Sequence, residues 1–182
     1  EKLRKSTKEK IDSAAIRLFA EKGYAATGVQ DIADAAGISI GLLYRHYKTK
    51  DELFATLAST AAEGMRTIVK LFESDGDPKE LIEAIANEIH HDMCKDEYLA
   101  QMLVVFEQSM HWEDTSQFAN GFMQINAQII QATMNLIIRG QQLCQFSKGD
   151  PHEMAIYFFA SIQGLGILKC SMGDAFVMPS GK

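Results

Sequence analysis

The stretch that decides the fold reads LFAEKGYAATGVQDIADAAGISIGLLYRHYKTKDELF and spans residues 18–54. Its apolar residues recur at helical spacing, and Gly37 interrupts them at a point where the backbone can turn tightly. The pattern predicts two short helices, over residues 29–36 and 40–47. An amphipathic helix over residues 6–22 is expected to precede them.

The two short helices carry the small and apolar residues that a crossing helix pair needs. The positions predicted to pack inward are Ile32, Ala33, Ala36, Ile38 and Leu43. Two short helices joined by a glycine turn and preceded by an amphipathic helix are typical of a helix-turn-helix unit that binds DNA.

Capping patterns and prolines divide the rest of the chain. Thr27 and Gln30 predict a capping box before the first short helix, and Thr49 and Glu52 predict another before a long helix. The further helices are expected over residues 50–74, 78–94, 96–110, 118–145 and 151–173. The alternation of β-branched residues that is typical of strands is absent, so the predicted fold class is all-α.

Charge is divided unevenly along the chain. The net charge is −6, but residues 1–50 carry ten Lys and Arg against six Asp and Glu, which gives +4. Residues 51–182 carry eight against eighteen, which gives −10. A basic head on an acidic body favours a module that binds a polyanion, although small charge asymmetries are also common in other proteins.

Residues 6–55 resemble the N-terminal domain of TetR/AcrR-type bacterial transcriptional regulators. The resemblance rests on the LF-x-x-x-G-Y lead-in, Thr27, the I-A-x-x-A-G-I-S core and the run L-Y-x-H-Y-K-x-K-x-x-L-F. It implies a three-helix helix-turn-helix DNA-binding domain over residues 1–49. It also implies a helical effector-binding and dimerisation domain over residues 50–182, where only the number, length and position of the helices agree with the family.

The resemblance implies a ligand-responsive repressor that acts as a homodimer on a palindromic operator. The DNA-binding residues that it implies are Thr27, Val29, Ser39, Ile40, Gly41, Tyr44, Arg45, His46, Lys48 and Lys50. Thr27 and Val29 would contact phosphate through a hydroxyl and a backbone N–H. Tyr44 and Lys50 match other phosphate-contacting positions of the family.

Arg45 is the candidate for reading base edges, because its guanidinium can pair with O6 and N7 of guanine. Tyr47 is expected to pack against the first helix rather than to touch DNA. Ile40 and Leu42 depart from the family pattern, and they either touch thymine methyl groups or pack against the domain. The operator sequence therefore does not follow from the resemblance. The basic run before residue 9 either reaches DNA or stays a solvated tail.

The last two long helices are the expected dimer faces, pairing with their copies into a four-helix bundle. Small residues would let a partner helix approach closely at Ala160, Ser161, Gly164 and Gly166. The alternative is that these helices only form the core within one chain. A two-fold dimer would place two recognition helices in successive major grooves, about 34–36 Å apart.

Methionines and aromatic residues are abundant between residues 50 and 145, which suits a pliable cavity for a small, hydrophobic effector. The expected lining residues are Met65, His90, Met102, Phe106, Met110, Phe122 and Asn126. An ordinary core with exposed or hydrogen-bonded polar residues fits the same pattern, so both interpretations stay open.

Metal binding, cofactor binding and catalysis find little support. His90 and Cys94 share one helix face, but a metal ion would require a third ligand such as His111. No phosphate-binding glycine loop or nucleophile elbow is present, so no metal, no cofactor and no enzymatic activity is predicted. Whether His90 and Cys94 bind a metal stays open.

Three widely spaced cysteines argue against a disulfide framework. The chain lacks an uninterrupted apolar run of about 18 residues and an apolar signal region, so we expect a cytoplasmic protein without a membrane span. The alternative function is a small-molecule sensor that signals through protein contacts, with a vestigial DNA-binding head. The effector, the operator, the regulated genes and the choice between repression and activation do not follow from the sequence.

Overall fold

The computed structural model describes residues 6–111 and 117–180, and at residues 117–120 and 122 it describes the backbone alone. The described residues form eight α-helices and a final 3₁₀ turn, without a strand among them. The elements are α1 (Thr7–Lys22), α2 (Val29–Ala36), α3 (Ile40–His46), α4 (Lys50–Phe72), α5 (Pro78–Lys95), α6 (Tyr98–Met110), α7 (Gln117–Gln142), α8 (Pro151–Met172) and η1 (Gly173–Ala175). The predicted all-α fold class is confirmed.

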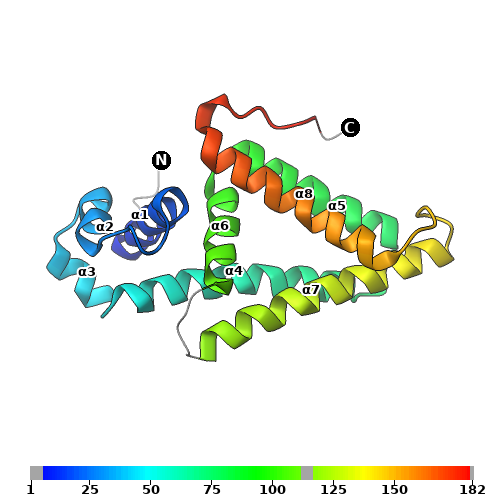
Figure 1. Ribbon diagram of the computed structural model, residues 1–182, viewed down its shortest axis with the longest axis horizontal. Helices are drawn as coiled ribbons and strands as arrows, with labels where there is room; N and C mark the ends of the chain where they lie inside the picture. Colours follow the sequence, from blue (N-terminus) through cyan, green and yellow to red (C-terminus); the bar gives the residue numbers. More distant parts are fainter. Residues whose placement is uncertain (1–5, 112–116, 181–182) are drawn as a thin grey trace.

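Helices α1, α2 and α3 form a head at one end of the molecule (Figure 1). The long helix α4 begins at the head and runs into the body, where it packs against α7. Helix α6 contacts both α1 of the head and α8 of the body, so it lies between these two parts.

The core of the head continues into the body. Buried side chains of α1, α2 and α3 form one cluster with residues of the first turns of α4, such as Leu53 and Phe54. Met102 and Val105 of α6 belong to the same cluster. Hydrophobic contacts therefore run unbroken across residue 50, and the division into domains at that position stays a prediction.

The helix starts differ in detail from the predicted capping boxes. Helix α2 begins after Gly28, whose N–H donates to the Asp31 carboxylate at 3.1 Å, so the predicted box of Thr27 and Gln30 is wrong. Only one of the two hydrogen bonds of the capping box predicted before α4 is present. The Thr49 hydroxyl accepts from the N–H of Glu52 at 3.0 Å, but the Glu52 carboxylate accepts from the N–H of Lys48.

Helix α8 packs closely on α6 through a glycine. A Cβ atom on Gly166 would lie 3.2 Å from Cδ1 of Leu103, so the absence of a side chain is what permits this approach. The expectation that Gly166 serves contact with a partner subunit is therefore wrong, because this glycine is buried against the chain's own α6.

The segment Pro151–Ala175 is long and apolar enough to cross a membrane by length and composition, with a mean hydropathy of 1.3. The sequence has no uninterrupted apolar run of that length, and one helix that passes this test is weak evidence for a membrane span, so the expectation of a protein without one is not contradicted. Only 11% of its apolar window is buried. Its exposed apolar side chains are Ile156, Tyr157, Ile167, Leu168 and Met172.

The turn between α2 and α3 makes a stability prediction. Gly37 has φ 66° and ψ 39°, a left-handed conformation that costs an alanine about 1–2 kcal/mol. We expect Gly37→Ala to lower the free energy of unfolding by about that amount, measured by urea unfolding. Gly41→Ala is the control, because a methyl group there meets no atom within 4 Å and α3 should gain up to about 1 kcal/mol. Equal stability of the two variants would contradict the prediction.

Candidate nucleic-acid interface

One face of α3 is turned outward from the head. Leu43 is buried on the inner side of this helix, whereas Ile40 and Tyr44 are 37% and 48% exposed. Gly41 and Arg45 follow them by one position each and are exposed as well. Residues four apart share a helix face, so these four positions form one surface. Ser39 caps the helix, and its hydroxyl accepts from the N–H of Leu42 at 3.2 Å.

The end of α3 is held on α1 by a buried phenol. Tyr47 is 3% exposed, and its hydroxyl donates to Oδ1 of Asp12 at 2.6 Å. Burial and this hydrogen bond raise the pKa of Tyr47 to about 12, so the phenol keeps its proton at neutral pH. Lys8 donates to the other oxygen of the same carboxylate at 2.8 Å. The prediction that Tyr47 packs against the first helix is confirmed.

Thr27 lies inside the head rather than on its surface. It is 1% exposed, and its hydroxyl donates to the carbonyl oxygens of Gly23 at 2.8 Å and Leu18 at 3.2 Å. The expected phosphate contact through this hydroxyl is therefore contradicted. Val29 is half-buried in the first turn of α2, where its backbone N–H stays a predicted contact.

Lys50 uses its charge within the protein. Its Nζ donates to the carbonyl oxygens of Tyr24 at 2.9 Å and Thr27 at 3.0 Å, and it lies 4.2 Å from the centroid of the Tyr24 ring. Two of the three ammonium donors thus fasten the loop between α1 and α2 to α4, and the phosphate contact expected of this half-buried lysine stays a prediction. His46 and Lys48 are exposed at the other end of α3 and stay predicted contacts.

The expected ligand-binding residues divide among separate places. Met65, Phe106 and Met110 share one hydrophobic cluster between α4, α6 and neighbouring helices. Met102 instead belongs to the core of the head. The two polar candidates do not join them, because Nε2 of His90 donates to the carbonyl oxygen of Pro179 at 2.9 Å and Asn126 is exposed. The side chain of Phe122 lies outside the described residues.

The described residues do not bring a metal-binding set together. His90 Nδ1 is 3.9 Å from Cys94 Sγ, so these two side chains do share a face of α5. The expected third ligand is engaged elsewhere, because His111 Nε2 lies 3.3 Å from Oε1 of Glu107. Within residues 6–111 and 117–180, no group of three or more suitable side chains gathers.

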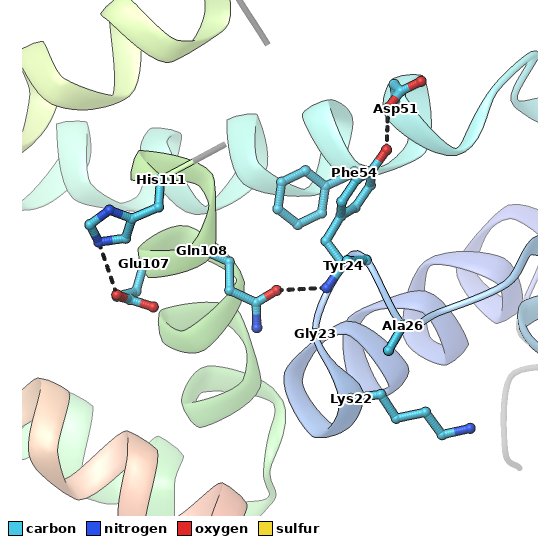
Figure 2. A pocket seen from close by; sticks show the side chains of 10 residues that line it. Lys22, Gly23, Tyr24, Ala26, Asp51, Phe54, Glu107, Gln108 and His111 are labelled. Atoms are coloured by element: carbon cyan, nitrogen blue, oxygen red, sulfur yellow. Dashed lines mark hydrogen bonds and ion pairs between the residues drawn. The ribbon is translucent and has the colours of Figure 1, made fainter. Parts of the chain in front are cut away.

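An open cleft of about 980 Å³ lies at the junction of head and body (Figure 2). It is lined by the loop after α1, by Asp51 and Phe54 of α4, and by the last turns of α6. Tyr24 and Gln108 meet in this cleft, where the N–H of Tyr24 donates to Oε1 of Gln108 at 3.2 Å. Sequence reasoning missed this pair, because 84 residues separate the partners and neither belongs to a local motif.

The family model described as "Bacterial regulatory proteins, tetR family" matches residues 11–57, which comprise most of α1, the short helices and the start of α4. Curated relatives with 44–56% identity match 24–26% of this chain and 16–23% of their own length. The transcriptional regulator TtgR of Pseudomonas putida is 25% identical over 87% of this chain and 78% of that protein.

Solved structures show that the whole fold is shared. The MbdR regulator from Azoarcus sp. CIB superposes with a TM-score of 0.77 over 96% of this chain and 92% of that one, at 21% identity. FadR from Bacillus subtilis, solved in complex with stearoyl-CoA, superposes with a TM-score of 0.62 over 93% and 89%, at 18% identity.

Two lysines that lie two positions apart in the sequence make contrasting predictions. Lys48→Met should leave the melting temperature unchanged. It should reduce the slope of the logarithm of DNA affinity against the logarithm of salt concentration by about one, because the exposed charge of Lys48 is available to phosphate. Lys50→Met should lower the melting temperature, because two carbonyl oxygens lose their donor. Thermal unfolding and binding titrations at several salt concentrations separate the two effects. An unchanged melting temperature for Lys50→Met would contradict the structural role.

Proposed function

We propose, from the match of residues 11–57 to the tetR family model and from the similarity to TtgR, that the chain is a ligand-responsive repressor of this family. In this proposal it acts in the cytoplasm, without catalytic activity, as a homodimer on a palindromic operator. The observation that best supports this proposal is the exposed face of α3. This helix lies within the residues matched by the family model and presents the phenol of Tyr44 and the guanidinium group of Arg45 to solvent.

DNA recognition is assigned to the outer face of α3. The guanidinium group of Arg45 reads a base edge, and Tyr44 donates to a backbone phosphate, with further contacts from Val29, Ser39 and Lys48. Ile40 and Gly41 lie on the same exposed face and approach the groove floor, where an apolar side chain can contact a thymine methyl group. His46 is assigned to a phosphate beside them.

Dimerisation is assigned to α8 together with α7. An apolar helix with few fully buried residues and several exposed apolar side chains is unfavourable in water, and a second copy of the same helix would cover them. Ile138 and Leu143 of α7 and its following turn are exposed apolar residues as well, at 38% and 60%. Two helices from each subunit would then form a four-helix bundle.

Effector binding is assigned to the cluster of Met65, Phe106 and Met110. Methionine side chains adapt their shape easily, and the cluster lies between α4 and α6, the two helices that also contact the head. The structurally similar FadR holds stearoyl-CoA, a molecule with a long apolar chain, which supports a hydrophobic effector here. Ligand and DNA would favour different arrangements of one dimer.

The first experiment is selection of random duplex DNA by the purified protein at near-physiological salt, followed by sequencing. We expect a palindromic site to be enriched. Arg45→Ala should lose about 1–3 kcal/mol of discrimination at one base of each half-site, while its binding to non-specific DNA survives. An equal loss of affinity on all sequences would make Arg45 a phosphate contact. A folded dimer that enriches no sequence would count against the proposal and favour signalling through protein contacts.

Two exposed tyrosines allow dimerisation and DNA binding to be tested separately. Tyr157 of α8 is 69% exposed and Tyr44 of α3 is 48% exposed. We expect Tyr157→Glu to give monomers in light scattering, because a charge would be buried in the bundle. Tyr44→Glu should leave the dimer intact and abolish operator binding, because a carboxylate would face phosphate. A dimeric Tyr157→Glu variant would contradict the assigned interface.

A further inference from the structure

One side chain of α6 makes two hydrogen bonds to the backbone of the head. Gln108 accepts from the N–H of Tyr24 at 3.2 Å and donates through Nε2 to the carbonyl oxygen of Phe19 at 2.9 Å. An amide offers a donor and an acceptor at once, which is what a helix end followed by a loop requires. Gln108 thus holds the last turn of α1 and the residue just beyond it.

One of the two bonded groups, the N–H of Tyr24, lies where the backbone of α1 no longer supplies a partner. Gly23 ends the helix with φ 82°, and its N–H donates to the carbonyl oxygen of Phe19 at 2.9 Å. Tyr24 is the next residue, so its N–H is already outside the helical pattern. A half-buried backbone N–H needs a partner, and the body of the protein supplies one here.

Tyr24 is also held by α4. Its carbonyl oxygen accepts from Lys50, and its hydroxyl donates to the carboxylate of Asp51 (Figure 2). Its ring packs on Phe54 with centroids 4.7 Å apart. Helices α4 and α6 therefore bind different groups of one head residue, α6 through the N–H and α4 through the carbonyl and phenol oxygens.

We infer that Gln108 is a positioning residue that sets the orientation of the DNA-binding head, by tying α6 to the loop that α4 also holds. A shift of α6 relative to α4 must either carry Tyr24 with it or break one of these hydrogen bonds. Because the effector cluster assigned above lies between the same two helices, this inference rests on the proposed function for its regulatory meaning. The positioning itself is a property of the single chain.

The test compares two leucine substitutions on the same helix. Gln108→Leu keeps approximate size and helix preference and removes both hydrogen bonds to the head. Gln101→Leu is the matched control, because Nε2 of Gln101 donates to the N-cap residue of its own helix, Glu97, at 3.1 Å and not to the head. Gln108→Glu is a second variant that retains an acceptor for Tyr24 and lacks the donor to Phe19.

The orientation of the head is measured without DNA. Spin labels on Ala35 of α2 and Ala86 of α5, both exposed, report the distance between head and body. The three native cysteines are replaced by serine, and dilution with unlabelled protein isolates distances within one chain. We expect Gln108→Leu to shift or broaden the distance distribution. Gln101→Leu should retain the wild-type distribution.

Two further readouts complete the test. Amide hydrogen exchange at Tyr24 should accelerate about tenfold in Gln108→Leu and stay near the wild-type rate in Gln108→Glu. Affinity for the selected operator should fall by about tenfold in Gln108→Leu alone. A wild-type distance distribution in a folded Gln108→Leu variant overturns the inference, whatever its melting temperature. If the wild-type protein itself binds no operator, that result would instead count against the proposed function, and the distance measurement would remain valid.

Discussion

The loop between α1 and α2 has its backbone hydrogen bonds completed by side chains from the body, and the placement of the head depends on this constraint. Lys50 binds two carbonyl oxygens of the loop, and Gln108 binds one N–H of Tyr24. Aromatic rings support the same point, since Phe19 and Phe54 meet edge to face at 5.3 Å. Such a ring pair contributes about 0.5–1.5 kcal/mol beyond its buried area. The head is thus joined to α4 and α6 by polar and apolar contacts together.

Local signals explain why the helix-turn-helix unit could be predicted from the sequence. Each of these signals acts within a few positions of the chain. They are the αL glycine at position 37, the cap at Ser39 and the helical spacing of the buried residues. The hydroxyl of Thr27 was assigned to the wrong partner, and the bonds of Lys50 to the loop were missed, for a related reason. A resemblance transfers a position in the sequence, whereas the bonding partner depends on where the side chain points after packing. Gln108 gave no signal at all, because a glutamine on a helix has the same local pattern whether or not it crosses to another domain.

Helix α8 shows a second limit of sequence patterns. Its apolar residues are spread around the helix, so periodicity alone does not tell which side packs against α6 and which stays exposed. The structure separates the two sides, because Ala155 and Gly166 are buried while Tyr157 and Leu168 are not. An exposed apolar surface on a helix of this length is the surface that dimerisation would remove from water. In the proposed dimer, folding and assembly would therefore use different residues of one helix.

The uneven distribution of charge between head and body makes the junction between them important for the proposed DNA binding. The body carries most of the negative charge of the chain, so it is repelled by the phosphates that the head must approach. In the proposed complex, contact with DNA would then be confined to the head, and small rotations of the head would change which groups meet the groove. A rotation about the junction moves α3 farther than it moves the residues of the loop, since α3 lies at the outer end of the head. If α3 is the recognition helix, a few hydrogen bonds at Tyr24 would control the position of its outer face, and a small shift between α4 and α6 would be enough to alter DNA binding.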